Sequence, residues 1–306
     1  MAILVVGSVA FDTIQSPFGK VEKILGGSAT YFSLAASYFT EVRVVAVVGD
    51  DFAPEHEEVL RKRGICLKGL QRAAGATFHW GGEYGENVNE AKTHFTHLNV
   101  FEKFQPQIPK EYAGSEYLFL ANIDPVLQAR VRRQMTKTQL VGGDTMNFWI
   151  NGKRADLLET LKLMDLLLIN DTEAKMLGGE SNLLRAANRV MAMGPKALVI
   201  KHGEYGATIF FGDTMGIGHH PFRAPALPLD EVRDPTGAGD SFAGGFMGYI
   251  ASQGVLNREV LKRAMFYGGV MGSFAVERFG PERLQSLSRK EIEERFQLFR
   301  ELTHLE

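Results

Sequence analysis

Residues 234–240 read Asp-Pro-Thr-Gly-Ala-Gly-Asp, and the apolar segment DSFAGGFMGYIA follows without a break over 240–251. Apolar side chains in this segment recur about every 3.6 residues, which predicts a helix that opens at Asp240 and buries one face. The small residues at 237–239 let the backbone approach a ligand, and their amides point out of the helix start. These unpaired N–H groups and the positive end of the helix dipole together predict an anion site.

Asp240 places a negative charge beside this predicted anion site. Because a carboxylate repels a phosphate, its position needs another purpose, and the natural one is to accept the proton of an attacking hydroxyl. The simpler alternative is that Asp240 caps the helix and the glycines form an ordinary turn. Other motifs in the chain bear on the choice between these hypotheses.

The motif at 234–240 resembles the C-terminal signature of the PfkB or ribokinase-like family of carbohydrate and nucleoside kinases, which commonly reads D-T-x-G-A-G-D. This chain departs from the signature by placing Pro235 before Thr236. Two further motifs stand in the family's order: a Gly-Gly pair at 26–27 ahead of a predicted helix, and N-x-x-E at 170–173. The resemblance therefore covers essentially the whole chain.

The resemblance implies a fold as well as an activity. It implies one domain over 1–306, an α/β fold of the ribokinase-like three-layer α/β/α type with a mostly parallel central sheet and a small β-sheet lid. The residue pattern agrees, because apolar runs such as AILVVG at 2–7 are typical of buried parallel strands and alternate with amphipathic segments. The lid is expected from about 13–25 and 76–100, where turn residues separate strand-like segments. Family lids cover the acceptor, and an exposed sheet edge could also pair in a homodimer.

The resemblance also implies residue roles. Asp240 is expected to be the general base, and the amides that stabilise the transferred phosphoryl group are those of Gly237, Ala238 and Gly239. The acceptor is expected to be held by Asp12, Gly26, Gly27, Tyr31 and Asp240. The residues expected to bind ATP are Asn170, Glu173, Gly203, Gly206, Thr236, Gly237 and Gly239. Of these, Asn170 and Glu173 hold Mg²⁺ largely through water in the family, and Asp234 stands where a ligand of a monovalent cation such as K⁺ would come from. The Lys201 side chain, at the same turn as Gly203, is in addition expected to reach a phosphate, which follows from its position and not from the resemblance.

Several of these residues also have structural explanations. Asn170 followed by Glu173 fits a capping box that needs no ligand. Asp12 could cap a turn, and the turn that contains Gly203 could belong to a plain hairpin. Tyr31 stands where the family often has Asn; its ring offers a stacking face for a flat acceptor, or it fills the core.

The composition of the chain limits which classes of partner and which compartment are expected for the protein. The chain has 306 residues with 45% apolar residues, a formal net charge of −2 and no long basic run, so neither nucleic acid nor a membrane is an expected partner. The single cysteine, Cys66, suits a reducing compartment, and the start lacks a basic segment ahead of its apolar run, so a cytoplasmic location is expected.

The sequence thus predicts an ATP- and Mg²⁺-dependent kinase that phosphorylates an alcohol group of a sugar or a nucleoside. One alternative is a catalytically silent protein that binds nucleotide or sugar on the same fold. A second is a nicotinamide oxidoreductase, which would need G-x-G-x-x-G after the first strand where this chain has G-S-V-A-F-D.

Overall fold

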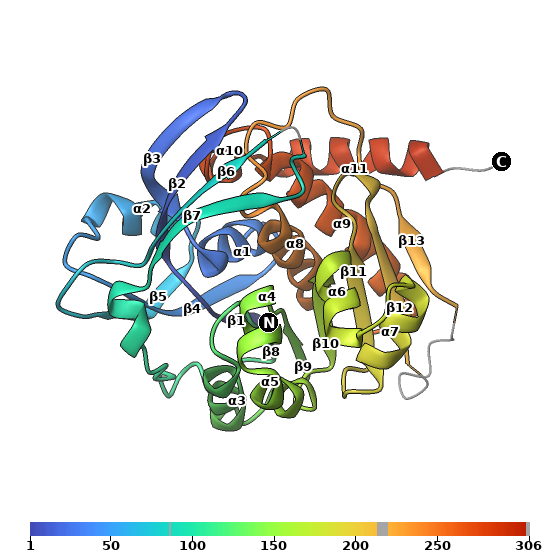
Figure 1. The fold of residues 1–306 in the computed structure, drawn as a ribbon, viewed down its shortest axis with the longest axis horizontal. Coiled ribbons are helices and arrows are strands. Elements are labelled where there is room, and N and C mark those ends of the chain that lie inside the picture. Colours follow the sequence, from blue (N-terminus) through green and yellow to red (C-terminus); the bar gives the residue numbers. More distant parts are fainter. Residues whose placement is uncertain (86, 213–219, 304–306) are drawn as a thin grey trace.

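Two β-sheets organise the computed structural model, which describes residues 1–85, 87–212 and 220–303 (Figure 1). The large sheet has the strand order β13-β12-β11-β10-β9-β8-β1-β4-β5, and the small sheet has the order β3-β2-β6-β7. The strands are β1 (Ala2–Val6), β2 (Ala10–Ser16), β3 (Gly19–Gly26), β4 (Glu41–Val48), β5 (Cys66–Arg72), β6 (His79–Tyr84), β7 (Ala91–His97), β8 (Tyr117–Leu120), β9 (Leu140–Gly143), β10 (Leu166–Asn170), β11 (Ala197–Lys201), β12 (Ala207–Phe211) and β13 (Phe222–Ala224).

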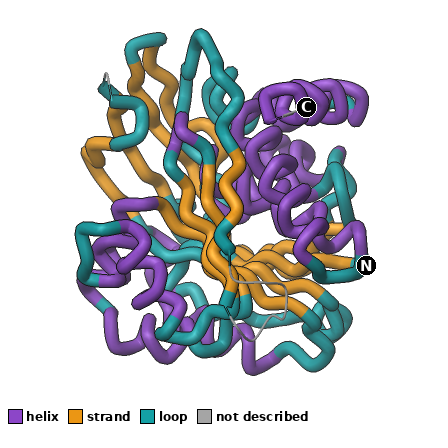
Figure 2. Tube along the Cα trace, turned by 90° about the vertical axis from the view of Figure 1, so that its right-hand side faces the viewer, coloured by secondary structure: helices purple, strands orange, loops and turns teal. Residues whose placement is uncertain are grey.

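Helices cover both faces of the large sheet (Figure 2). They are α1 (Ser28–Ala36), α2 (Pro54–Lys62), α3 (Pro125–Gln134), α4 (Asn147–Gly152), α5 (Arg154–Leu161), α6 (Asp171–Gly178), α7 (Leu183–Met191), α8 (Ala238–Gln253), α9 (Arg258–Ala275), α10 (Glu282–Gln285) and α11 (Arg289–Thr303), with short 3₁₀ turns at Asn99–Lys103 and Gly203–Tyr205. One core packs α1, α2 and α8 to α11 on the sheet, and the other packs α3 to α7 on its opposite face. Among the helices of the described ranges, none is both long and apolar enough to cross a membrane.

β1 shows why the central strands are apolar throughout. Ile3 and Val5 point into one core, whereas Leu4 and Val6 point into the other, and all four are fully buried. β1 pairs in parallel with β4 and β8, and parallel pairing continues through β9, β10 and β11. Only β12 and β13 run antiparallel to their neighbours in this sheet as described. The predicted α/β/α layering with a mostly parallel sheet is therefore confirmed.

The carboxyl ends of the parallel strands meet along one edge of the large sheet, as parallel pairing requires. Asp144 directly follows β9, Asn170 ends β10 and Lys201 ends β11. In open α/β sheets this edge is where ligands bind. The strand order thus brings together side chains that lie far apart in the sequence.

The small sheet is formed by β2, β3, β6 and β7. β2 begins at Ala10, earlier than the expected start near residue 13, so Asp12 lies within a strand opposite Ile24 and Trp80. The pairs β2–β3 and β6–β7 are antiparallel, and β2–β6 is parallel. β3 and β7 form the edges, and most side chains of β7 are exposed. Pairing of such an edge in a homodimer stays a prediction.

α8 departs from the expected helix in two ways. It begins at Ala238, two residues before Asp240, because Gly237 at φ 72° turns the chain into the helix. It is also buried all round rather than along one face, since α1 and α9 pack on it. Close approach of α1 depends on Gly244, where a methyl group would lie 2.8 Å from the Cβ of Ala35. The prediction of a single buried face was therefore wrong.

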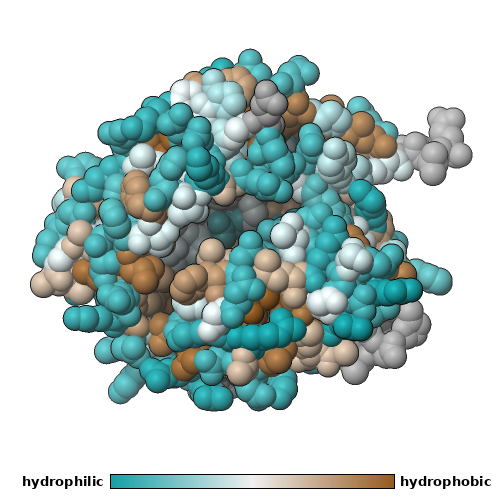
Figure 3. Space-filling model, in the orientation of Figure 1, coloured by the Kyte–Doolittle hydropathy of each residue, from teal (hydrophilic) through white to brown (hydrophobic). Residues whose placement is uncertain are grey.

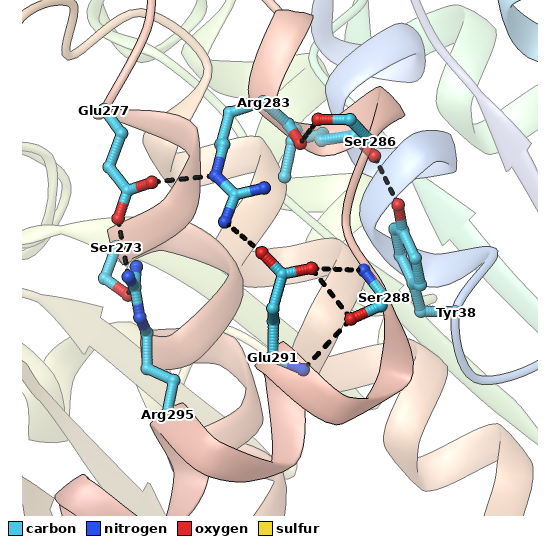
Figure 4. Close-up of polar contacts among 9 residues, drawn as sticks. Tyr38, Ser273, Glu277, Arg283, Ser286, Ser288, Glu291 and Arg295 are labelled. Carbon is cyan, nitrogen blue, oxygen red and sulfur yellow. Dashed lines mark hydrogen bonds and ion pairs between the residues drawn. The ribbon is translucent and has the colours of Figure 1, made fainter.

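A polar network braces the segment that follows α9 (Figure 4). Glu277 accepts hydrogen bonds from Arg283 (2.9 Å) and Arg295 (2.6 Å), and Arg283 also donates to Glu291 (2.6 Å). The carbonyl of Val276, next to this cluster, accepts a hydrogen bond from the amide of residue 233 at 2.9 Å. The network thus supports the segment against which the 234–240 loop rests.

Candidate active site

The loop at 234–237 is fixed by the side chain of Asp234, which is fully buried. One carboxylate oxygen accepts the amide of Thr236 at 2.9 Å, and the other accepts the amide of Gly280 at 2.7 Å. Burial raises the pKa of Asp234, while the Gly280 and Thr236 hydrogen bonds oppose that rise. The carboxylate expected beside a monovalent cation therefore ties the loop to the segment after α9.

Gly237 holds the next part of the loop. At φ 72° it adopts a left-handed conformation that suits glycine, and a methyl group there would overlap the ring of Tyr31. Of the three expected phosphate-binding amides, that of Ala238 donates to the carbonyl of Pro235 at 3.1 Å. Within the described ranges, the amides of Gly237 and Gly239 have no protein acceptor. Of the three amides that the sequence predicted to bind an anion, two, those of Gly237 and Gly239, therefore remain available to a ligand.

Asp240 lies in the first turn of α8, three residues after Gly237, which is the N-cap residue of this helix. The alternative that Asp240 is an ordinary N-cap was therefore wrong. Burial raises the pKa of Asp240 to about 6, and the ammonium of Lys201 limits the rise. Lys201 comes from the end of β11, and its Nζ lies 2.8 Å from the point that a methyl group at Gly239 would occupy. The structure thus brings Lys201, Gly239 and Asp240 together.

Asp12 and the Gly26–Gly27 pair meet at the base of the small sheet. A methyl group at Gly26 would overlap the Asp12 carboxylate, and one at Gly27, whose φ is 94°, would lie 2.5 Å from the Ser8 carbonyl oxygen. Burial raises the pKa of Asp12 to about 8, Asp234 adds to the rise, and the Gly27 amide opposes it. The glycines therefore let the chain approach Asp12 and Ser8 closely.

Tyr31 does not offer the stacking face that its sequence position suggested. Its side chain is 1% exposed and its ring lies under Gly237, so it supports the loop from within the core. Its buried hydroxyl has no hydrogen-bond partner in the described structure. Burial raises the pKa of that hydroxyl, and the nearby charges of Asp234 and Asp12 add to the rise. The alternative of a core position is the one that the structure supports.

Asn170 and Glu173 form the capping box that their spacing allowed. Asn170 Oδ1 accepts the Glu173 amide at 2.8 Å, and Glu173 Oε2 accepts the Asn170 amide at 2.8 Å. Burial raises the pKa of Glu173, and Lys201 opposes that rise. The pair therefore starts α6 and also lies within electrostatic reach of Lys201.

A pocket of about 420 Å³ adjoins the loop at 234–240. Figure 3, which views the molecule in the orientation of Figure 1, shows a hollow near the middle of the visible face. Gly203 and Gly206 line the pocket from the turn between β11 and β12, and both have positive φ. Apolar residues of the 224–232 segment and of α9 form much of the remaining wall. Gly239 and Lys201 also line the pocket, and Gly239 directly precedes Asp240 in the chain. The turn is thus a hairpin that also borders a pocket.

Asp144 is a candidate site residue at the exit of β9, where the sequence predicted a polar lining but gave this residue no individual role. It is 7% exposed, and its buried Oδ1 has no hydrogen-bond partner in the described structure. Burial raises its pKa, with Asp240 and Glu173 adding to the rise and Lys201 opposing it. Its place directly after a buried strand was the available signal. Three carboxyl groups, from Asp144, Glu173 and Asp240, are therefore within electrostatic reach of the Lys201 ammonium.

The model of the pfkB family of carbohydrate kinases matches residues 2–286 of this chain. The chain belongs to the pfkB family. The family is one of kinases that phosphorylate an alcohol group, and ATP use follows from membership. This assignment replaces the hypothesis of a nicotinamide oxidoreductase.

Named relatives within the pfkB family include nucleoside kinases. A cytidine kinase of Thermococcus kodakarensis is 30% identical over 254 residues, which are 80% of this chain and 87% of that protein. A nucleoside kinase of Methanothermobacter thermautotrophicus is 25% identical over 299 residues, which are 92% and 91% of the two chains.

Solved structures share the fold. A nucleoside kinase of Burkholderia thailandensis in complex with inosine has a TM-score of 0.75 at 20% identity and covers 97% of this chain and 98% of its own. An aminoimidazole riboside kinase of Salmonella enterica, solved with its riboside and an ATP analogue, has a TM-score of 0.76 at 18% identity, with 97% and 100% covered. At these identities the likeness supports the pfkB fold of this chain.

Proposed function

We propose that this pfkB-family kinase transfers the γ-phosphoryl group of ATP to a hydroxyl of a nucleoside. The proposal rests chiefly on one arrangement, the Asp240 carboxylate in the first turn of α8 beside Lys201 and the open Gly239 amide. The choice of a nucleoside draws on the relatives, because the two named above are a cytidine kinase and a nucleoside kinase.

The reaction assigns a separate task to each group of the loop. Asp240 accepts the proton of the acceptor hydroxyl as that oxygen attacks the phosphorus. Lys201 and the amides of Gly237 and Gly239 stabilise the charge on the phosphoryl oxygens, supported by the positive end of the α8 dipole. The pocket bordered by Gly203 receives the rest of the donor. These groups are held before the reaction, so catalysis comes mainly from positioning.

Asp12 holds the acceptor in this proposal. With a pKa raised to about 8 by burial, its carboxyl group is mostly protonated at neutral pH before the acceptor arrives. A protonated carboxyl both donates and accepts hydrogen bonds, which suits vicinal hydroxyls of a ribose. The Gly26–Gly27 backbone beside it completes this side of the site.

The donor groups around Lys201 fit a magnesium ion. No three His, Cys, Asp or Glu side chains in the described ranges could hold an ion by themselves, so a hard ion here would depend on water and phosphate oxygens. Glu173 and Asp144 are the carboxyl groups that would face that hydrated ion, and the unpartnered Oδ1 of Asp144 suits such a contact. When bound, Mg²⁺ would neutralise charge on the phosphates. Both Asp234 oxygens accept backbone hydrogen bonds and each keeps a further lone pair, so K⁺ ligation by this carboxylate stays a prediction.

The direct test is release of ADP from Mg-ATP in the presence of cytidine, uridine, inosine, adenosine or ribose. Turnover should require an acceptor, and a nucleoside should give a higher kcat/KM than ribose. A preference for ribose would contradict the nucleoside assignment. Binding of nucleotide without turnover on any acceptor would instead favour the silent binding protein.

The pH dependence of kcat/KM should report the ionisation of the Asp240 carboxyl group. Because its pKa of about 6 lies above the ordinary 3.8, the base is lost at a higher pH than for an exposed aspartate. We expect kcat/KM to fall as the pH drops through about 6 and to stay high up to about 8, where the Asp12 carboxyl loses its proton. The residual rate of Asp240→Asn should lack this acidic limb. An unchanged limb in that variant would assign the titration to another group.

Glu173→Gln separates the two tasks of the capping box. Glutamine keeps an oxygen that can accept the Asn170 amide, so the thermal midpoint should change little. Loss of the negative charge should raise the Mg²⁺ concentration needed for half-maximal rate, measured by titration at fixed ATP. Glu173→Ala should in addition lower stability by about 1 kcal/mol. A magnesium requirement equal to wild type in both variants would leave Glu173 with a capping role alone.

A further inference from the structure

The small sheet contacts the phosphate-binding loop directly. Tyr84 is the last residue of β6, and its hydroxyl accepts a hydrogen bond from Thr236 Oγ1 at 3.2 Å. Thr236 immediately precedes Gly237, the residue whose left-handed backbone leads into α8. The Thr236 hydroxyl thus contacts Tyr84 and also lies close enough to Asp234 to lower the pKa of that carboxyl. The orientation of that side chain therefore depends in part on a residue of another sheet.

A second contact from the same hairpin reaches the donor pocket. Val88 and Asn89, between β6 and β7, line it, and the Asn89 side chain lies so close to Gly203 that a methyl group there would overlap it. Gly203 belongs to the turn after β11, whereas Thr236 precedes α8, so the hairpin touches two separate walls of the donor site. A single contact could arise by chance, whereas two contacts from one hairpin favour a role for that hairpin in positioning the donor site.

The electrostatic surroundings favour a protonated Tyr84. Burial raises the pKa of its hydroxyl, although the Thr236 hydrogen bond opposes the rise, and Asp234, Asp12 and Asp240 raise it further. The hydroxyl therefore keeps its proton at neutral pH and has both a donor and an acceptor function. It accepts from Thr236, and its own proton is available for a second hydrogen bond.

We propose that Tyr84 is a positioning residue that holds the phosphate-binding loop through Thr236, so that the small sheet completes the donor site. This inference rests on the proposed function for its catalytic meaning, although the loop contact itself is independent of turnover. The acceptor-binding Asp12 lies on β2, which pairs with β6. The small sheet thus carries both Asp12, which binds the acceptor in the proposed function, and Tyr84, which holds the phosphate-binding loop.

Tyr84→Phe is the decisive variant, because it removes the hydroxyl and keeps the ring. Thr93→Val is the matched control: it removes a hydroxyl that accepts from Trp80 Nε1 at 3.3 Å within the same hairpin, away from the loop. We expect Tyr84→Phe to raise hydrogen exchange of the Thr236 and Ala238 amides, which have protein acceptors, by about 3- to 10-fold and to weaken ADP binding by a similar factor, the size of one ordinary hydrogen bond. Thr93→Val should change neither.

A double-mutant cycle isolates the pair. Thr236→Val should weaken ADP binding like Tyr84→Phe, the double variant should be no weaker than either, and Thr236→Ser should restore affinity. Additive losses, or an effect of Tyr84→Phe no larger than that of Thr93→Val, would overturn the proposal. Calorimetric titration with ADP and exchange measurements give this answer even if no acceptor is phosphorylated, so failure of the proposed function is seen separately.

Discussion

Asp240→Asn should lower kcat/KM for phosphotransfer by roughly 10²–10⁴-fold, the usual range for loss of a general base. The amide nearly matches the carboxylate in shape but cannot accept the proton of the acceptor hydroxyl. Affinity for ADP should be retained or improved, because the nearby negative charge is removed from the phosphate site. Rates would be measured by coupled ADP release and affinity by calorimetric titration.

The same variant should keep its stability, which separates a chemical defect from a folding defect. The folded-state pKa of Asp240, about 6, lies above the ordinary 3.8, so ionisation at neutral pH disfavours the folded state. Asparagine removes that penalty, and the thermal midpoint at pH 7 should be equal to wild type or higher. Below about pH 4, where the aspartate is protonated in both states, this difference between the variants should vanish.

Asp156→Asn is a matched control for Asp240→Asn. Asp156 also stands three residues after a helix N-cap, in α5, and it is exposed. Because both substitutions remove a negative charge from a first helical turn, they share any effect of the helix dipole. Activity of Asp156→Asn should stay within a few-fold of wild type. If Asp240→Asn also kept an activity within a few-fold of wild type, Asp240 would not be the general base.

The parts of the fold that the sequence predicted are those that local patterns encode. The apolar run at 2–7 gave β1, and the glycine-rich loop before α8 was placed in the correct region. Asn170 and Glu173 form contacts three residues apart, and such spacing is visible in the sequence. Each of these features depends on neighbours along the chain.

The parts that it missed depend on contacts between distant segments. Tyr31 lies under Gly237, and Asp144 joins Lys201 and Asp240 because β9 and β11 lie on either side of β10. Periodicity describes one segment at a time, so it could not show that α8 is enclosed on all sides. A tyrosine at an apolar helix position is consistent with a ligand face and with a core face. Only the packing of α1 on α8 distinguishes them here.

Gly237→Ala should lower phosphotransfer by about 10²-fold and also destabilise the protein. A left-handed backbone costs a residue with a side chain about 1–2 kcal/mol. The added methyl group also overlaps the Tyr31 ring, and such overpacking typically costs about 1–3 kcal/mol. Because the loop must shift to relieve the overlap, the amides proposed to bind phosphate move with it, and a displacement near 1 Å is enough for a loss of about 10² in rate. The measurements are kcat/KM and chemical denaturation.

Gly64→Ala separates the two causes of the Gly237 defect. Gly64 has the same φ of 72°, but a methyl group there would meet no atom within 4 Å. It should therefore show only the backbone cost of about 1–2 kcal/mol, with kcat/KM unchanged. Replacing Tyr31 by Ala in the Gly237→Ala background should then recover part of the lost rate, because it removes the ring that forces the loop to move. Equal losses of stability and activity in the two alanine variants would show that the ring does not fix the loop.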